Sequence, residues 1–324
     1  TKNAAPRNVY ATKLGGDFRK TRINNLFKSS GSFVRIPENE IDVLIADEAH
    51  RLNAKSGMCQ NLGENQIKEI IKASKFSVFF IDESQRVTLK DIGSVEEIKK
   101  YIEQANAESE IMELESQFRC NGSDGYISWL DDVLDIRKTA NGEGFDLDYD
   151  IKICDTPNEV RDIIFEKNKI NNKARLLAGY CWNWIKDGKN KSDVFDITIP
   201  EYDFAMSWNL NNSKTWAIDP DSVNEVGCIH TCQGLEFDYV GVIIGDDLRY
   251  EDGKIVTDVT KRAKTDQSIR GIHKLEKQDL NKAQKIADEI IKNTYRTLMS
   301  RGQKGCYIYC VDKALANYLR ERIN

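Results

Sequence analysis

The sequence has no pair of cysteines at the CxxC spacing typical of zinc sites, although it contains eight cysteines in 324 residues. It also has no apolar run long enough to cross a bilayer. The opening residues, Thr1 to Arg7, lack the apolar core of a secretory signal. Cysteines scattered through a long chain without such a signal are typical of reduced intracellular thiols. We therefore predict a cytoplasmic protein with no membrane segment and no structural zinc.

The chain also lacks an overall positive charge. It has 47 lysines and arginines against 52 acidic residues, which gives a net charge of -5 and a pI near 5.5. This balance provides no general attraction to nucleic acid, so nucleic acid would have to bind a local basic groove. The length exceeds the usual size of one domain, and the composition, 40% hydrophobic and 31% charged, is that of a globular protein. We therefore expect two domains.

Two short apolar runs each end in polar residues that suit nucleotide chemistry. The runs are 43–46 and 78–81, and the residues that follow them are Asp47, Glu48, Asp82 and Gln85. In a parallel sheet, ligands bind outside the carboxyl ends of the strands. Carboxylate oxygens suit Mg²⁺, and a carboxylate or an amide can position an attacking water. The pattern predicts a site for a Mg²⁺-bound nucleoside triphosphate at this sheet edge.

Apolar runs and turn residues alternate along the chain, which predicts an α/β fold with parallel sheets. The expected strands are 41–46, 76–81, 111–114, 151–154, 176–180, 226–229, 240–244 and 306–310. The expected helices are 64–73, a helix that begins at Ser94 with a capping-box spacing, 124–134, 158–168 and 280–298. The polar segment between Arg249 and Lys277 carries several cations. We interpret it as a mobile loop, with a nucleic-acid contact as the alternative.

Five segments occur in the order and approximate spacing of helicase motifs. Residues 47–50, 82–86, 116–119, 228–237 and 295–302 resemble motifs II, III, IV, V and VI of superfamily 1 helicases. The first segment also spells DEAH, which would suggest superfamily 2, but the last two segments fit superfamily 1 better. Over nearly its whole length the chain resembles the Schlafen group 3-like DNA/RNA helicase domain family, and Thr1 to Arg7 look like motif Ia.

This resemblance implies an ATPase with two RecA-like domains, each with a parallel sheet flanked by helices. Residues 1–115 would be the first domain, truncated at its N-terminus, with motifs Ia, II and III. Residues 116–324 would be the second, with motifs IV, V and VI and a polar insertion at about 249–277. The implied function is that of a helicase or translocase that hydrolyses ATP with Mg²⁺ between the domains and moves single-stranded DNA or RNA. Fused or partner domains are expected in the full-length protein.

The resemblance also implies roles for single residues. Asp47 would coordinate Mg²⁺, Glu48 would be the catalytic base, and Gln85 would sense the γ-phosphate. Arg119 and Arg301 match the arginines of motifs IV and VI, and arginine suits this role because it stays cationic and forks onto two phosphate oxygens. In motif V, Gly234 would permit close backbone approach, Glu236 would hold the ribose, and His230 and Thr231 would face the nucleic-acid strand. For His50, coupling to the other domain and a hydrogen-bonded turn remain equal alternatives.

Two features depart from the helicase pattern. The sequence contains no GxxxxGK[ST] phosphate-binding loop. Because the first residues resemble motif Ia, we expect this loop to precede Thr1, and we expect the chain alone to bind ATP weakly and hydrolyse little. No aromatic residue closely follows Gln85, where many superfamily 1 helicases stack bases, and the five tryptophans are expected mainly in cores. The alternative function is therefore a nucleotide-gated nucleic-acid-binding or signalling module without strand unwinding.

Overall fold

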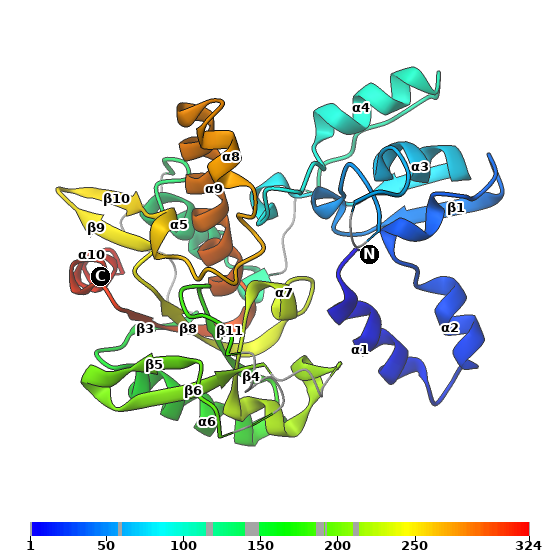
Figure 1. Cartoon of the computed structure of the whole chain (residues 1–324). Helices are drawn as coiled ribbons and strands as arrows, with labels where there is room; N and C mark the ends of the chain where they lie inside the picture. Colours follow the sequence, from blue (N-terminus) through cyan, green and yellow to red (C-terminus); the bar gives the residue numbers. More distant parts are fainter. Residues whose placement is uncertain are drawn as a thin grey trace. The chain divides into compact units, whose positions relative to one another are not determined.

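The computed structural model describes residues 2–57, 60–114, 119–139, 149–185, 191, 193–209 and 214–323. The chain forms two compact units, Thr1–Leu114 and Glu115–Asn324. Each unit contains helices and parallel strands, which confirms the predicted α/β fold (Figure 1). The division between the units falls beside the domain boundary expected from the sequence.

The first unit contains a two-stranded parallel sheet, β1–β2, whose strands are connected through α3. Its elements are α1 (Ala4–Leu14), α2 (Lys20–Leu26), η1 (Ser30–Phe33), β1 (Ile41–Ala46), η2 (Ala49–Arg51), α3 (Gln66–Ala73), β2 (Ser74–Phe79), η3 (Glu83–Gln85) and α4 (Val95–Gln104). The register places the first residue of β1 beside the first of β2 and the last beside the last. The residues that follow the two strands therefore emerge at one edge of the sheet.

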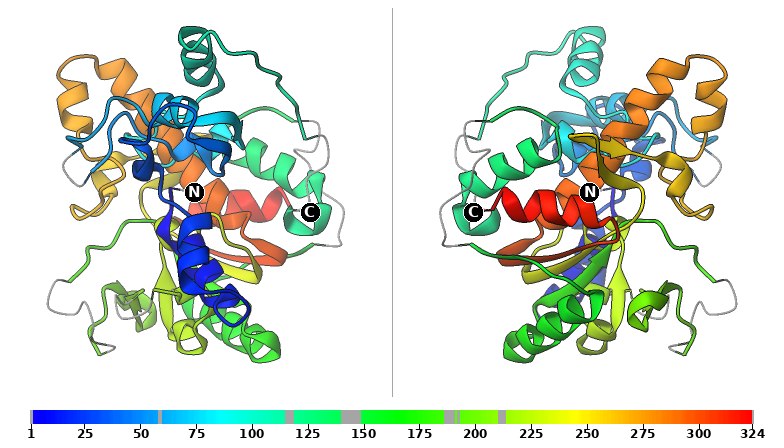
Figure 2. Two further views of the ribbon diagram at one scale, coloured as in Figure 1. Left: turned by 90° about the vertical axis from the view of Figure 1, so that its right-hand side faces the viewer. Right: turned by 90° about the vertical axis from the view of Figure 1, so that its left-hand side faces the viewer.

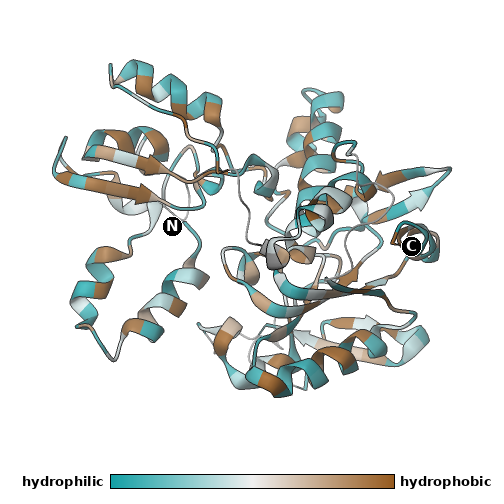
Figure 3. Cartoon of the chain, turned by 180° about the vertical axis from the view of Figure 1, so that it is seen from behind, coloured by the Kyte–Doolittle hydropathy of each residue, from teal (hydrophilic) through white to brown (hydrophobic). Residues whose placement is uncertain are grey.

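One face of this sheet is covered by helices. Leu44 and Ala46 of β1 belong to a buried cluster with Ile67 and Ile70 of α3. The side chain of Asn65 accepts a hydrogen bond from Ile67 N at 2.9 Å and so caps α3. Val43 and Ile45 of β1 point the other way and are 57 and 60% exposed. Much of both strands has the colour of hydrophobic residues in Figure 3. At these two positions β1 is therefore apolar but not buried.

The second unit is built on a seven-stranded sheet with the order β3-β11-β8-β4-β7-β6-β5, and only the β5–β6 pair is antiparallel. Its strands are β3 (Asp150–Ile153), β4 (Ala174–Ala178), β5 (Ile197–Ile199), β6 (Phe204–Trp208), β7 (Glu225–Gly227), β8 (Phe237–Ile244) and β11 (Gly302–Cys310), with a separate hairpin of β9 (Leu248–Glu251) and β10 (Lys254–Thr257). Its helices are η4 (Arg119–Gly122), α5 (Asp124–Val133), α6 (Pro157–Asn171), η6 (Pro200–Tyr202), η7 (Trp216–Ile218), η8 (Pro220–Asn224), α7 (Ile229–Cys232), η9 (Val259–Lys261), α8 (Ile272–Glu276), α9 (Leu280–Met299) and α10 (Lys313–Glu321).

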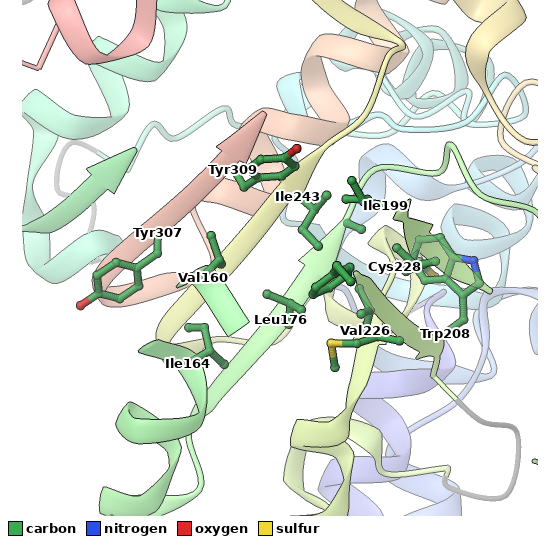
Figure 4. Packing of buried hydrophobic residues seen from close by; sticks show 14 of the residues in the cluster. Val160, Ile164, Leu176, Ile199, Trp208, Val226, Cys228, Ile243, Tyr307 and Tyr309 are labelled. Carbon is green, nitrogen blue, oxygen red and sulfur yellow. The ribbon is translucent and has the colours of Figure 1, made fainter. Parts of the chain in front are cut away.

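Helices cover both faces of this larger sheet. Within the second unit, α6 lies on one face and α9 on the other (Figure 2). On the α6 face, Val160 and Ile164 pack beside Leu176 of the fully buried strand β4 (Figure 4). The helix approaches so closely that a Cβ on Gly241 of β8 would lie 2.5 Å from Val160 Cγ1. This packing makes the middle of the sheet a rigid support for the loops at its two ends.

Two predictions from the sequence are wrong. Residues 111–114 form no strand, and Ile111, Met112 and Leu114 are 63, 82 and 78% exposed. A short apolar run becomes a strand only where a neighbouring strand pairs with it, and no strand among the described residues does so here. The polar segment between Arg249 and Lys277 is not a structureless loop, because it contains most of the β9–β10 hairpin together with η9 and α8.

Candidate functional site

The turn after β1 has an unusual backbone at Glu48. This residue has φ 57° and ψ 44°, a left-handed conformation that side chains rarely adopt. Its amide donates a hydrogen bond to Asp47 Oδ1 at 2.9 Å, and its carbonyl accepts one from Arg51 N at 2.9 Å. Strain of this kind persists only where surrounding contacts hold it, and it is common at functional sites. The turn buries Glu48 and leaves Asp47 exposed.

A chain of contacts joins this turn to the turn after β2. His50 Nε2 lies 3.0 Å from Glu48 Oε2, and the Asp82 amide donates to His50 Nδ1 at 3.4 Å. Because Nδ1 accepts, the proton of a neutral imidazole sits on Nε2 and faces the Glu48 carboxylate. The side chain of Gln85, which is 1% exposed, donates from Nε2 to Asp82 Oδ2 at 2.7 Å. The structure therefore brings Asp47, Glu48, Asp82 and Gln85 to one sheet edge. His50 is hydrogen-bonded in this turn, and its coupling to the other domain stays an alternative prediction.

The electrostatics of this edge single out Asp47. Partial desolvation raises the pKa of its carboxyl group, and the neighbouring Glu48 charge raises it further. Two adjacent carboxylates disfavour each other's ionisation, and a divalent cation would relieve that repulsion. Among the described residues, no group of three or more metal-binding side chains gathers at one place. One or two carboxylates suit Mg²⁺, which usually completes its shell with waters and substrate phosphates.

Gly93 packs directly against the backbone of the turn that contains Ala49 and His50. A Cβ on this residue would lie 2.0 Å from Ala49 O and 2.7 Å from His50 Cα, so that only glycine fits against the backbone. We expect Gly93→Ala to destabilise the protein by about 1–3 kcal/mol, as overpacking does, and to move His50 away from Glu48. Gly16→Ala is the matched control, because nothing lies within 4 Å of that position. Thermal unfolding checks the prediction, and equal midpoints for the two variants would contradict it.

In the second unit, the guanidinium of Arg301 is buried at the end of α9. The side chain is 1% exposed, and its Nε donates to Thr297 O at 3.1 Å. Nη2 donates to Ser300 Oγ at 3.4 Å. Its assignment as the motif VI arginine finger stays a prediction. To contact a phosphate with its full fork, Arg301 would have to exchange some of these hydrogen bonds.

Arg119 begins η4, but its side chain and residues 116–118 of the proposed motif IV lie outside the described residues. Its neighbour Cys120 has φ 52° and donates from Sγ to Ser300 O at 3.8 Å. The backbone segments that carry Arg119 and Arg301 therefore lie close together within the second unit. The predicted pairing of the two arginines is compatible with this arrangement and stays a prediction.

Glu236 and Arg301 precede neighbouring strands of the second sheet. Phe237 and Gly302 are paired in register, and the Phe237 amide donates to Arg301 O at 2.9 Å. Glu236 is exposed, and Gly234 has φ +81°, a backbone conformation that favours glycine. These residues lie at the amino ends of β8 and β11, whereas the polar residues of the first unit follow the carboxyl ends of β1 and β2. The position of Glu236 and Arg301 before these strands can be read from the sequence, since an apolar run follows shortly after each residue.

His230 and Thr231 lie in α7, which follows the carboxyl end of β7. His230 Nε2 is 3.3 Å from Ser268 Oγ. The Thr231 hydroxyl accepts from Cys228 N at 2.9 Å and lies 3.2 Å from Asn209 Oδ1, and so it caps its own helix. Thr231 thus has a structural role whatever it contacts besides. His230 and Thr231 follow the carboxyl end of β7, whereas Glu236 precedes the amino end of β8, although all three belong to one proposed motif.

A buried ionic cluster in the second unit has no counterpart in the sequence prediction. The fully buried Arg262 side chain contacts Asp247 Oδ2 at 3.1 Å and Asp266 Oδ2 at 2.6 Å. The Tyr295 hydroxyl also donates to Asp247. Burial alone would lower the pKa of Arg262, but the charges of Asp266 and Asp247 raise it above its ordinary value. The cluster fixes the segment after β10 to the carboxyl end of β8 and to α9.

The structure also bears on the expectations for membrane spans, tryptophans and cysteines. No helix among the described residues has both the length and the apolar character needed to span a membrane. Trp129, Trp208 and Trp216 are buried, which confirms that most of the tryptophans fill cores. The cysteines among the described residues are free thiols, namely Cys120, Cys154, Cys181, Cys228, Cys232, Cys306 and Cys310.

The mostly parallel seven-stranded sheet with helices on both faces is consistent with a RecA-like helicase fold. The chain belongs to the family described as Schlafen group 3, DNA/RNA helicase domain, whose family model matches residues 1–312. It is also similar to the uncharacterized protein YPL245W of Saccharomyces cerevisiae, with 26% identity over 304 residues. That match covers 87% of this chain and 64% of the yeast protein. The family membership makes a nucleic-acid helicase-like domain the established description of the chain.

Proposed function

We propose that this chain is the catalytic core of an ATP-dependent motor that moves along single-stranded DNA or RNA. The observation that carries the proposal is the contact chain from Glu48 through His50 and Asp82 to Gln85. It links the predicted base on one strand end to the predicted phosphate sensor on the next. An imidazole that holds a buried carboxylate in one orientation is one way in which a general base can be positioned.

In this proposal each residue has a distinct task. Asp47, exposed at the sheet edge, would hold Mg²⁺, which would supply charge neutralisation for the phosphates when bound. Glu48 would take a proton from the attacking water, and His50 would keep its carboxylate oriented. Gln85 would contact the γ-phosphate side of the nucleotide. Arg301, together with Arg119, would stabilise the negative charge that grows on the transferred phosphoryl group.

The second unit would supply the remaining contacts. Glu236, exposed before β8, would bind the ribose, and the left-handed Gly234 would let the backbone approach the nucleotide. His230, at the carboxyl end of β7, would contact the strand. The free and mostly buried thiols fit a reducing compartment, and we propose the cytoplasm.

Stimulation by nucleic acid tests this function against the alternative of a nucleotide-gated binding or signalling module. ATP hydrolysis is measured in the gene product that carries this chain, with and without single-stranded DNA and RNA. We expect single strands to raise the rate many-fold, because strand movement and hydrolysis are coupled in a motor. An unchanged rate together with ATP-dependent strand binding would favour the module. Absence of both hydrolysis and strand binding would contradict the proposed function.

A further inference from the structure

The segment 259–277 of the second unit, which we call the basic segment, has an unusual surface charge. Its exposed cations are Lys261, Lys264, Arg270, Lys274 and Lys277. Its two acidic residues are not exposed, because Asp266 is buried with Arg262 and Glu276 is partly buried beside His273 at 2.8 Å. In a chain with a net charge of -5, the exposed lysines and arginine of this segment therefore have no equally exposed acidic residue among them.

The exposed cations of the basic segment have no acidic partners among the described residues, unlike some of the other surface lysines. Elsewhere, Lys152 pairs with Glu159 at 2.6 Å, and Lys313 pairs with Glu201 at 2.9 Å. Within the part of the chain that the structure describes, none of the exposed cations of the basic segment forms an ion pair. Lysines without acidic partners can neutralise phosphates, and the counterions condensed on the nucleic acid are then released.

Buried contacts hold the basic segment in place. Besides the Arg262 cluster, the Ala263 amide donates to Tyr180 O at 2.8 Å, just beyond the end of β4. Ile272 of α8 packs against Ala283 and Ala287 of α9, and the two helices lie side by side in Figure 1. A surface held in this way loses little conformational freedom when a ligand binds.

The basic segment is joined directly to motif V. Asp266, one of the two acids on Arg262, accepts a hydrogen bond from Ser268 N at 2.7 Å. The hydroxyl of Ser268, which is fully buried, lies 3.3 Å from His230 Nε2. His230, the predicted strand contact of motif V, is therefore linked through Ser268 and Asp266 to Arg262, the buried residue that anchors the basic segment.

We propose that the basic segment is a binding surface for the sugar-phosphate backbone of a single strand, continuous with His230. The proposal rests on the proposed function, because it names where that function holds its nucleic acid. Its chemistry is recognition of phosphates by lysines and Arg270, which fixes position without reading sequence. DNA and RNA share these phosphates, so the surface is expected to bind both.

Replacement of three lysines tests this inference. We expect Lys261→Gln, Lys264→Gln and Lys274→Gln together to weaken strand binding about tenfold or more at low salt. The slope of log affinity against log salt concentration should fall by about 2, because each phosphate contact on a single strand contributes about 0.7. The measurement is fluorescence anisotropy of labelled oligo(dT) and oligo(rU) over a series of salt concentrations, with the whole gene product and no nucleotide.

A matched triple variant controls for net charge. Lys152→Gln, Lys169→Gln and Lys313→Gln remove the same charge from lysines that are paired with acids. We expect this variant to bind the strand with an affinity within about twofold of that of the unmodified protein, because the replaced lysines are paired with neighbouring carboxylates. Equal losses of strand affinity in the two triple variants would overturn the inference. They would not overturn the proposed function, because the unmodified protein would still bind the strand. An unmodified protein that binds neither oligonucleotide would overturn the inference and the proposed function together.

Discussion

Glu48→Gln is expected to lower ATP hydrolysis by about 100-fold or more, which is the usual contribution of a positioned general base. Glutamine keeps the size of the side chain, and its amide oxygen can still accept a hydrogen bond from His50 Nε2. The fold should therefore survive, with a midpoint of thermal unfolding close to that of the unmodified protein. The rate is measured in the gene product that carries this chain, at saturating ATP, Mg²⁺ and single strand.

The matched control for this substitution is Glu83→Gln. Glu83 stands in the second Asp-Glu pair, after β2, and its Oε1 accepts from Val95 N at 2.8 Å. It is exposed, and its carboxylate bonds to the start of α4 rather than to Glu48, His50 or Gln85. We expect this variant to keep at least half of the activity. Equal activity in the Glu48 and Glu83 variants would show that Glu48 is not the base.

Arg262→Ala is expected to destabilise the second unit by about 3–5 kcal/mol, the usual result of leaving buried charges without their partner. Asp247 and Asp266 would both remain buried, and the basic segment would lose its anchor to β8. For a unit of this size we expect the unfolding midpoint to fall by roughly 6–20 °C, since 1 kcal/mol corresponds to about 2–4 °C. Differential scanning calorimetry measures this midpoint directly.

Arg249→Ala provides the matched comparison. Arg249 lies in the adjacent hairpin and also contacts two acids, Glu251 at 2.6 Å and Asp258 at 3.4 Å. Its side chain is 21% exposed rather than fully buried, so we expect a loss of about 1 kcal/mol or less. If both variants lost the same stability, burial would not be the source of the effect at Arg262.

The features that were predictable from sequence are those set by neighbours along the chain. The strand 41–46 and the helices capped by Asn65 and Ser94 depend on local periodicity and on side chains that bond the first helical amides. The gathering of Asp47 and Gln85 at one edge follows equally from two short parallel strands joined by a helix. The strand and the two helices need no distant contact, and the shared edge needs only the pairing of two strands that one helix connects.

The features that were not predictable depend on contacts between distant residues. The run 111–114 has the composition of a strand, yet no neighbour pairs with it among the described residues. The basic segment has the composition of a loop, yet Arg262 finds a buried partner in Asp247, across the β9–β10 hairpin. Neither the missing strand nor the anchored segment can be predicted from local periodicity.

One recurring pattern shows the limit of reading function from composition. The apolar strand β8 ends in Asp246 and Asp247, as β1 ends in Asp47 and Glu48. Asp247 is fully buried and holds an arginine, whereas Asp47 is exposed at the sheet edge. A strand followed by acids therefore does not by itself show whether those acids are accessible to a metal ion.

The peptide hydrogen bond from Phe237 to the carbonyl of Arg301 has a mechanical consequence. It joins the first residues of two neighbouring strands, so that the backbones beside Glu236 and Arg301 belong to one sheet and are expected to shift together. In the proposed function, a displacement of either strand would therefore change both contacts to a nucleotide at once.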